Sequence, residues 1–492
     1  MNLVGFGLTG HDSSVAAYKN GKFLYRKAER QFKSKHAYAN KAWAQTVLNE
    51  WGIEKYESME STFLTGSNPK KIKEDNKLDH HYTHLLSSSA YRDIHLVLDS
   101  LSVGPAMNGM DMSPYTGMVK INEDVYRQLE FVNVPQLLNT CIRSTQVKEN
   151  VETFGFGDIL AFFEDLLKNH SHPNFHKLVE SIDFPGKVMG LQAYGKPNRD
   201  ELEKWVPIDC GGGGRSSIVQ KLMTQGKYDN NHVATIHKFC EIITLEKATV
   251  MPGPFTYSGG VAQNVVINRA MLDAGLDVHI DPWAYDGGCS IGALHYLLDK
   301  HSIERPNHWE QDDEAPLGEP DGPLFKRVAE LLAQNKVVGW YQGKGEVGPR
   351  ALGNRSILFN PTHKDNKDRI NKIKNREWWR PFGASVKEDQ ADRFFDLPVS
   401  RHMLFNSNVK YSGIPAVTHV DGTCRHQTVP ETNHQYYWML EAFEQEAGLP
   451  VLGNTSLNKQ GKPICSTVEE ALDIFKTSEL DAICIGDKLY EN

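Results

Sequence analysis

The chain has 492 residues, too many for a single core, and its 40% hydrophobic and 10% aromatic content is ample for two. A formal net charge of −8 argues against a general nucleic-acid binder or a protein held to anionic membranes, although a local basic site remains compatible with it. The seven cysteines are scattered singly without a CxxC pair, which indicates neither a disulfide framework nor a zinc knuckle.

Residues 1–14 lack the basic start and unbroken apolar core of a secretory signal, and no run approaches the ~18 apolar residues of a membrane-spanning helix, so we expect a cytoplasmic protein.

The first elements of the chain are predicted to be strands. Residues 2–8 form an apolar run, and 14–28 predict two strands joined by a tight Asn20-Gly21 turn. His11 lies in the loop between strands, where catalytic side chains are often displayed, although most loop histidines are exposed and idle.

A histidine pair follows on a predicted helix over 79–91. His80 and His84 are four residues apart, so their imidazoles project from one helix face and can hold a metal ion, although such a pair is as readily structural. Asp99 ends a strand-like run and Asp286 precedes a helix-like one, so both are candidate ligands. Nitrogen and oxygen ligands without a thiolate favour iron(II) or manganese, with zinc or magnesium as alternatives.

A glycine-rich turn lies between the strand-like residues 255–258 and a helical pattern over 265–275. Gly259 and Gly260 let backbone amides approach a phosphate or ribose at the helix N-terminus, where Asn264 stands. A glycine pair is a weak signal by itself, because many tight turns contain one.

Residues 311–323 are rich in proline, glycine and acids, so we expect a linker between domains spanning 1–310 and 324–492. The second domain is predicted to begin with a helix over 324–334 and a strand over 337–341. The stretch 339–356 then holds two arginines, a lysine and five glycines, typical of an anion-binding loop. Arg350 and Arg355 offer planar forks for phosphate or carboxylate, unless they pair with surface acids.

Several ordered motifs carry a resemblance to one family. They run from near the first residue to near the last: HDSS at 11–14, HHYTH at 80–84, GKVMGLQAYG at 186–195, GGVAQN at 259–264, GPRALGNRS at 348–356, WWRPF at 378–382, DGTCRHQTV at 421–429 and NTSLN at 454–458. Together they resemble the ATP-dependent O-carbamoyltransferases, which carbamoylate nodulation factors, aminoglycosides, cephalosporins and ansamycins.

The resemblance implies an α/β fold with an ASKHA-type N-terminal domain (actin/hexokinase-like, a duplicated ribonuclease-H-like unit) and a YrdC-like C-terminal domain. It implies that the second domain converts carbamoyl phosphate and ATP to a carbamoyl-adenylate. The first would carry the carbamoyl group to a hydroxyl of a small molecule, such as a natural product, a sugar or a hydroxymethylated nucleoside.

The resemblance also assigns roles. His11 matches the general base, Lys35 a basic residue near the nucleotide cleft, and Gly259, Gly260 and Asn264 the nucleotide-binding turn. His80, His84, Asp99 and Asp286 match the metal ligands. The carbamoyl phosphate site would comprise Arg350, Lys374, Arg380, Arg425, Asn454 and Ser456.

Other functions stay open. A threonylcarbamoyl-adenylate-type enzyme modifying tRNA has similar domains, although the net charge and the carbamoyl phosphate set speak against it. A sugar kinase would need neither the histidine pair nor the second domain, and an inactive ASKHA nucleotide-binding scaffold would show no turnover. The loops that would shape the acceptor pocket, in roughly 100–185, carry no motif that names the acceptor. Whether the chain forms a homo-oligomer is likewise open.

Overall fold

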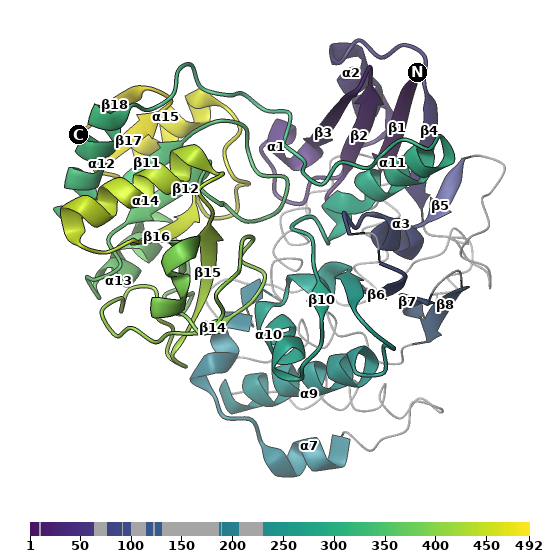
Figure 1. Ribbon diagram of the computed structural model, residues 1–492, viewed down its shortest axis with the longest axis horizontal. Helices are drawn as coiled ribbons and strands as arrows, with labels where there is room; N and C mark the ends of the chain where they lie inside the picture. The colour runs from purple at the N-terminus through teal and green to yellow at the C-terminus, as the bar shows by residue number, and fades with distance from the viewer. Residues whose placement is uncertain are drawn as a thin grey trace. The chain divides into compact units, whose positions relative to one another are not determined.

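The computed structural model describes residues 1–8, 11–62, 76–90, 92–99, 115–121, 124–129, 186–187, 189–205 and 230–492. These residues form two compact units, whose elements are labelled in Figure 1. The first comprises Met1–Phe23, Lys27–Glu29 and Lys35–His308, and the second comprises Leu24–Arg26, Arg30–Ser34 and Trp309–Asn492. Apart from two strands, the stretch 100–185 expected to shape an acceptor pocket lies outside the described residues.

The first sheet of the first unit has the strand order β3-β2-β1-β4-β5. β1 pairs antiparallel with β2 and parallel with β4, and β4 pairs parallel with β5. Asn20 and Gly21, with φ of 51° and 82°, turn the chain between β2 and β3, so the predicted hairpin is confirmed. The strands are β1 (Asn2–Gly7), β2 (Ser14–Lys19), β3 (Lys22–Lys27), β4 (Glu57–Thr62) and β5 (Lys77–Asp79).

The second sheet repeats this arrangement, with the order β10-β9-β6-β7-β8. β6 pairs antiparallel with β7 and parallel with β9, which in turn pairs parallel with β10. Two sheets with the same order and the same strand directions are the duplicated ribonuclease-H-like arrangement expected for this part of the chain. The strands are β6 (Ile94–Leu98), β7 (Tyr115–Ile121), β8 (Asp124–Leu129), β9 (Phe255–Ser258) and β10 (Val278–His279).

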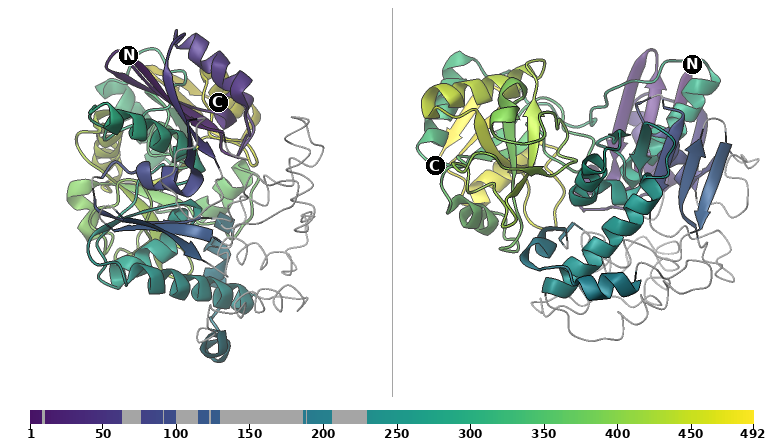
Figure 2. Two further views of the ribbon diagram at one scale, coloured as in Figure 1. Left: turned by 90° about the vertical axis from the view of Figure 1, so that its right-hand side faces the viewer. Right: turned by 60° about the horizontal axis from the view of Figure 1, so that its bottom comes forward.

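Helix α11 (Cys289–Lys300) packs against β1, β4 and α3 (His80–Leu86). The close approach depends on Gly292, because a Cβ at this position would lie 1.9 Å from the carbonyl oxygen of Thr83. The long helix α9 lies beside α10 and α7 (Figure 2). The remaining helices of this part are α1 (Ala28–Phe32), α2 (Lys41–Glu50), α7 (Arg199–Trp205), α9 (Asn230–Ala248), α10 (Val265–Asp273), and the 3-10 turns η1 (Gln192–Tyr194), η3 (Gly260–Gln263) and η4 (Asp286–Gly288).

The second unit is built on one eight-stranded mixed sheet of order β14-β15-β13-β16-β12-β11-β17-β18, so the predicted α/β class is confirmed. Its first helix starts where Asp321 accepts the amide of Leu324, and it buries Val328, Leu331 and Leu332. The elements are α12 (Gly322–Ala333), β11 (Val338–Tyr341), β12 (Arg355–Phe359), α13 (Asn366–Ile373), β13 (Gly383–Lys387), η5 (Glu388–Arg393), β14 (Ser407–Asn408), β15 (Thr423–Val429), α14 (His434–Ala447), β16 (Val451–Ser456), α15 (Val468–Thr477), β17 (Ala482–Ile485) and β18 (Lys488–Glu491).

Part of the stretch expected as a linker packs within the second unit. Gln311 is buried, and the Asp313 carboxylate accepts hydrogen bonds from Gly345 and Arg355. The acids of this stretch therefore include a structural one, which composition alone does not distinguish from a solvated one.

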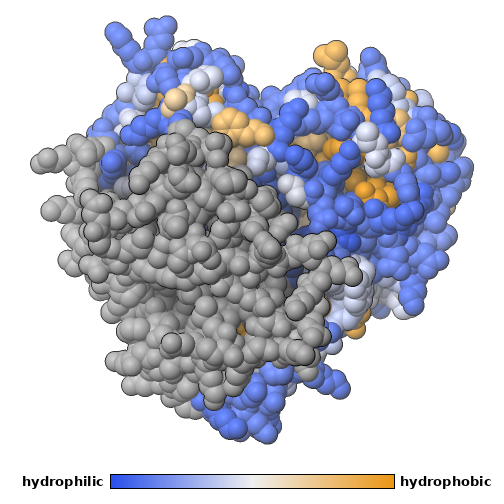
Figure 3. Space-filling view, turned by 180° about the vertical axis from the view of Figure 1, so that it is seen from behind, coloured by the Kyte–Doolittle hydropathy of each residue, from blue (hydrophilic) through white to orange (hydrophobic). Residues whose placement is uncertain are grey.

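Most of the described surface on the face drawn in Figure 3 is hydrophilic, with hydrophobic residues in small groups. Within the described residues, no helix is long and apolar enough to cross a membrane.

Candidate functional site

The four candidate metal ligands of the first unit converge. Nε2 of His80 lies 3.0 Å from Oδ2 of Asp99, and Nε2 of His84 lies 3.3 Å from the same oxygen. Asp286 Oδ1 lies 3.7 Å from His80 Nε2 and 3.4 Å from His84 Nε2. All four residues are buried, and one donor atom from each falls within 4.8 Å of the others. Two imidazole nitrogens and two carboxylate oxygens fit a divalent transition-metal ion.

Each ligand is positioned by the end of a regular element. Asp79 caps α3 by accepting the Tyr82 amide, so that His80 and His84 project from the first turns of this helix. Asp99 follows the last residue of β6, and Asp286 begins η4, immediately before α11. The helix spacing of the histidines was visible in the sequence, whereas the approach of the two aspartates depends on the tertiary fold.

The buried histidines and carboxylates of this cluster shift one another's pKa values. Burial by itself lowers the pKa of His80, but Cys289, Asp286 and Asp99 outweigh it and raise this pKa to about 10. Burial raises the pKa of Asp99, while hydrogen bonds from His80 and His84 hold it well below its usual range. In the absence of an ion, protons on the histidines therefore balance the buried carboxylates, and a metal cation would displace them.

Cys289 is a further polar neighbour that sequence reasoning missed. Its Sγ lies 3.7 Å from Nδ1 of His80 and 3.6 Å from Nε2 of His84. The predicted ligand set contains no sulfur, and the structure places this one beside both histidines. The spacing Asp286-Gly-Gly-Cys289 was the available signal, because a residue three positions after a ligand in a helical turn lies on the same side.

His11 lies at the edge of this cluster, with Nε2 3.6 Å from Oδ2 of Asp286. Its Nδ1 lies 2.9 Å from Oδ2 of Asp12, which also lies 2.7 Å from Nδ1 of His36. Burial lowers the pKa of His11, but Asp286 and Asp12 outweigh it and the net shift is upward. Asp12 has a φ of 52°, a conformation that is uncommon outside glycine and is often found at functional sites. Lys35 precedes His36 and is half-buried.

The predicted nucleotide turn also organises the metal cluster. Gly259 has a φ of 94°, and a Cβ there would lie 2.1 Å from the carbonyl oxygen of Leu98. The Gly260 amide donates to Oδ1 of Asp99 at 3.0 Å. Asn264 caps α10 by accepting the Val266 and Ile267 amides at 3.2 Å. The turn therefore orients Asp99 and begins α10.

The second unit gathers the other predicted residues at one edge of its sheet. β13 and β15 run parallel, and both start at this edge, where Gly383 is paired in register with Arg425. β16 runs antiparallel to β13 and ends there, with Asn454 opposite Gly383. β12 starts at the same edge, because Ser356 pairs with Ser456. Arg350, Lys374 and Arg380 lie in segments that flank these strand ends.

The polar contacts of Lys374 and Asn454 define this edge. Nζ of Lys374 donates to the carbonyl oxygen and to Oδ1 of Asn458, at 3.1 and 2.7 Å, and contacts Ser456. Nδ2 of Asn454 donates to the Ala351 carbonyl at 3.2 Å, which ties β16 to the loop that carries Arg350. Oδ1 of Asn454 is buried and has no hydrogen-bond partner among the described residues. A buried amide oxygen left in this state can accept a hydrogen bond from a bound ligand.

Three arginines of this edge repel one another. Burial and the neighbouring charges of Arg380 and Arg425 hold the pKa of Arg376 well below its usual range. Burial first, and Arg380 as the neighbouring cation, lower the pKa of Arg425 to about 10. Arg376, which donates to Asn371 and Pro381 and stacks on Phe382, was missed because the basic run 363–381 reads as a solvated helix face. Such concentrated positive charge favours a bound anion.

Arg355 differs from the expectation of a second anion fork. It is completely buried, stacks on Tyr341, and donates to Asp313 at 3.2 Å and to the Glu314 carbonyl at 2.9 Å. Arg355 thus pairs with an acid, which was the alternative to anion binding. Its role is to hold the loop 342–354 against the expected linker.

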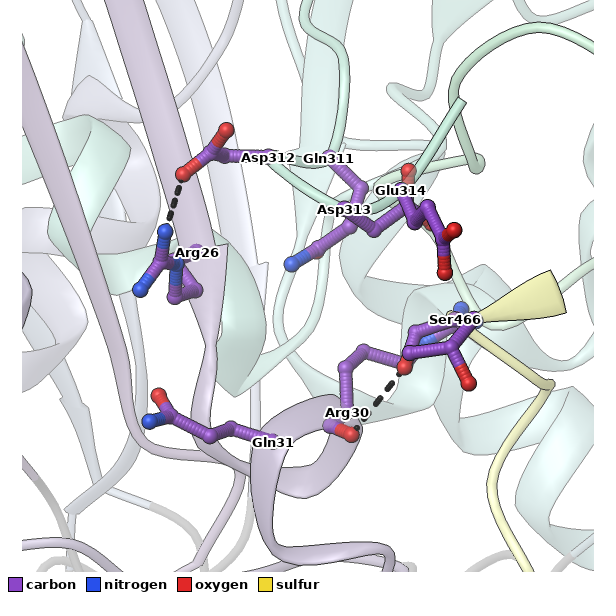
Figure 4. A pocket seen from close by; sticks show the side chains of 9 residues that line it. Arg26, Arg30, Gln31, Gln311, Asp312, Asp313, Glu314 and Ser466 are labelled. Carbon is purple, nitrogen blue, oxygen red and sulfur yellow. Dashed lines mark hydrogen bonds and ion pairs between the residues drawn. The ribbon is translucent and has the colours of Figure 1, made fainter. Parts of the chain in front are cut away.

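A separate pocket of about 220 Å³ lies within the second unit (Figure 4). Asp312 pairs with Arg26 at one side, and the Ser466 hydroxyl donates to the Arg30 carbonyl at the other. None of the predicted site residues lines this pocket.

These observations define the class of the protein: it is a two-unit α/β protein with a buried His/Asp cluster and a cationic sheet edge. Residues 329–492 match the family description "Carbamoyltransferase C-terminus", and residues 215–294 match "Carbamoyltransferase N-terminus". The chain belongs to this carbamoyltransferase family.

Three relatives give the range of the similarity. The nodulation protein NolO of Bradyrhizobium diazoefficiens is 33% identical over 68% of this chain and 71% of the relative. The nodulation protein NolNO of Sinorhizobium fredii is 36% identical over 62% of this chain and 52% of the relative. The 3'-hydroxymethylcephem-O-carbamoyltransferase of Streptomyces clavuligerus is 35% identical over 49% of this chain and 44% of the relative. The chain thus spans about half the length of the last two relatives.

Proposed function

We propose that this protein transfers a carbamoyl group from carbamoyl phosphate, activated by ATP as a carbamoyl-adenylate, to a hydroxyl of a small molecule. The observation that carries the proposal is the cationic sheet edge of the second unit, together with the family of the chain and its O-carbamoyltransferase relative. A dianionic phosphate relieves the repulsion among these arginines, which explains why so much positive charge is collected there.

In this proposal the second unit is the YrdC-like part and forms the adenylate, with loss of inorganic phosphate from carbamoyl phosphate and of pyrophosphate from ATP. Arg350, Arg380 and Arg425 bind the phosphate through charge-assisted hydrogen bonds, with Lys374 as a further cation. Asn454 accepts a hydrogen bond from the carbamoyl amide through its buried Oδ1, which has no partner in the described part of the chain, and the Ser456 hydroxyl orients the same group. Burial at this edge also limits the access of water to an intermediate that water destroys.

The first unit is the ASKHA-type part and carries the transfer step. His11 takes the proton of the acceptor hydroxyl through Nε2 as the oxygen bonds to the carbamoyl carbon and AMP leaves. Asp12 holds Nδ1 of His11 at 2.9 Å, which fixes the tautomer that leaves Nε2 as the base. Lys35, Gly259, Gly260 and Asn264 border the nucleotide in this assignment, with the glycine turn acting through the backbone.

The metal site consists of His80, His84, Asp99 and Asp286, and iron(II) or manganese suits the nitrogen and oxygen donors. When bound, the ion supplies positive charge for nucleotide phosphates. Asp286 links the ligand set to His11, because its two oxygens face the two sides.

The test is a product analysis with carbamoyl phosphate, ATP and a panel of alcohols. Mass spectrometry should find a carbamate ester of at least one alcohol, formed only when both other substrates are present. Consumption of carbamoyl phosphate without AMP and pyrophosphate would refute the adenylate route. Transfer to tRNA instead of to any alcohol would favour the threonylcarbamoyl alternative.

A further inference from the structure

Asp12 bonds to two histidines through a single oxygen. Its Oδ2 lies 2.9 Å from Nδ1 of His11 and 2.7 Å from Nδ1 of His36. A carboxylate oxygen only accepts, so each imidazole donates to Asp12 from Nδ1. We propose that His36 is a positioning residue of the transfer site, which holds the Asp12 carboxylate toward His11 and so keeps Nε2 of His11 as the base. The inference rests on the role of His11 in the proposed function.

The backbone brings the two segments together. The Asp12 amide donates to the His36 carbonyl at 3.4 Å, and the Ser13 amide donates to the Ala37 carbonyl at 3.1 Å. The Ser13 hydroxyl accepts a hydrogen bond from the Ala39 amide at 2.9 Å. Asp12 and His36 have φ of 52° and 53°, a conformation that residues other than glycine seldom adopt. The fold therefore maintains this contact against backbone strain at both of its ends.

The second oxygen of Asp12 explains why a bond from His36 is needed. Oδ1 is buried, and within the described part of the chain it has no hydrogen-bond partner. Nζ of Lys27 lies 3.6 Å from it, close enough for an ion pair but too far for a hydrogen bond. A rotation of the carboxylate toward Lys27 would strengthen this ion pair and weaken the bond to His11. The bond from His36 opposes that rotation.

Glu29 supports the same arrangement from the other side. Its Oε1 accepts from Nζ of Lys27 at 2.8 Å, and its Oε2 accepts from the backbone amide of His36 at 3.2 Å. Glu29 thus gives the Lys27 charge a second partner and fixes the backbone that carries His36. Burial by itself raises the pKa of Asp12, but both histidines and then Lys27 outweigh it and hold this pKa well below its usual range. Asp12 is therefore a carboxylate that can accept both bonds.

The alternative for the three side chains is a second metal ion, because one donor atom each from His11, Asp12 and His36 lies within 4.8 Å of the others. Ligands of an ion with bonds of about 2.0 Å stand about 2.8 Å or more apart. The 2.7 Å between Asp12 and His36 is ordinary for a hydrogen bond and short for two ligands of one ion. The distance therefore favours a hydrogen-bonded set.

The first measurement needs no substrate. Low-field proton NMR of the full-length protein labelled with nitrogen-15 histidine detects imidazole N–H groups that bond to a carboxylate, and the signal lost in His11→Gln belongs to His11. His36→Ala and His36→Phe both remove the second donor, the latter with the ring volume kept, and both should shift or broaden the His11 signal. His36→Asn should keep it, because the Asn amide places a donor near the position of Nδ1 and tolerates a positive φ.

A His11 signal that is unchanged in both donor-less variants would overturn the proposal. So would the absence of any His11 signal from the parent, since the bond between His11 and Asp12 is the one that His36 is inferred to hold.

The second measurement is the rate of transfer to the alcohol that the product panel identifies, with pyrophosphate release followed in parallel. In His36→Ala the kcat of transfer should fall by about 10- to 100-fold, below the roughly 100- to 10,000-fold that a positioned base contributes. The KM of the alcohol and the release of pyrophosphate should stay at the parent values, and His36→Asn should recover most of the loss. His301→Ala is the matched control, because His301 of the same unit also bonds to a carboxylate, that of Glu57 at 2.7 Å, and it should transfer at the parent rate.

Asp12→Asn separates a positioning role from a direct one. In the Asp12→Asn background, His36→Ala should lower the rate of transfer no further, because the carboxylate through which His36 acts is gone. An equal further loss, or a raised KM, would mean that His36 contacts a substrate and would contradict the proposal. A second equivalent of bound metal that His36→Ala removes would identify an ion site instead. A parent that releases no pyrophosphate would refute the proposed function, whereas the NMR comparison would still decide whether His36 holds Asp12.

Discussion

Replacing Arg380 with alanine tests the anion site of the second unit. The side chain of Arg380 is 31% exposed and lies 3.6 Å from Glu377, a longer separation than that of a close ion pair. Its positive charge is therefore available to a ligand. The same charge acts together with burial to lower the pKa of both Arg376 and Arg425. Its loss should weaken anion binding without weakening the fold.

The magnitude follows from the bond that is removed. A hydrogen bond to a charged group contributes about 1.5–3 kcal/mol, which corresponds to about 10- to 150-fold in affinity. Because Arg380 is partly exposed, solvent screening favours the lower part of this range, about 10- to 30-fold. The free energy of unfolding should stay the same or rise, since one of three mutually repelling cations is gone.

Calorimetric titration with carbamoyl phosphate, and with inorganic phosphate as a stable probe, measures the affinity, and urea unfolding measures the stability. Arg401→Ala is the matched control, because Arg401 is an exposed arginine of the same unit that pairs with Glu388 at 2.7 Å. It should bind the anion as the parent does. An Arg380→Ala protein that binds within twofold of the parent, or an equal loss in both variants, would refute the assignment of the anion site.

Three further predictions follow from other contacts. His11→Ala should still release pyrophosphate from ATP and carbamoyl phosphate but fail to carbamoylate an acceptor, and equal loss of both activities in a paired assay would make His11 structural. Gly292→Ala should lower the free energy of unfolding in urea by about 1–3 kcal/mol and reduce the amount of bound metal, because the new Cβ meets the Thr83 carbonyl. Gly253→Ala is the control, because its Cβ makes only an ordinary contact at 3.5 Å, and it should change neither quantity. A Gly292→Ala protein that matches the parent would contradict the packing argument. His426 is buried, and burial lowers its pKa from 6.5 to about 4. Between pH 6.5 and pH 4 this histidine is therefore protonated in the unfolded chain but neutral in the folded one. The free energy of unfolding should fall by up to about 3 kcal/mol over this range. His426→Gln should flatten part of that loss in unfolding curves at several pH values, and an unchanged pH dependence would remove His426 as its source.

Local signals predicted several elements, although the helix expected over 79–91 ends at Leu86. The Asn20-Gly21 turn, the capped helix of His80 and His84 and the strand before the glycine-rich loop each depend on neighbouring residues, so the pattern of the sequence was sufficient. The convergence of Asp99 and Asp286 on the histidines depends on the close approach of α11 to α3, which no local pattern encodes. The motif resemblance supplied that pairing before the fold did.

The residues that the sequence analysis misjudged or overlooked also depend on tertiary contacts. Arg355 and Arg350 look alike in the sequence. Yet Arg355 is enclosed by Asp313 and the Glu314 carbonyl, from a segment that composition marked as a linker, and by the Gly343 carbonyl. Cys289 looked like an isolated cysteine, because the two histidines that adjoin it are far away in the chain. Arg376 was hidden in the basic run 363–381, whose exposed lysines, Lys364 and Lys372, are typical of a solvated helix face.

Pyrophosphate release tests the central claim most directly. The purified protein is incubated with ATP alone, with carbamoyl phosphate alone and with both, and AMP, ADP and pyrophosphate are quantified. The account predicts AMP and pyrophosphate in equal amounts only when both substrates are present, and a loss of both products in Arg380→Ala. Formation of ADP without pyrophosphate, or AMP formation that is independent of carbamoyl phosphate, would contradict it.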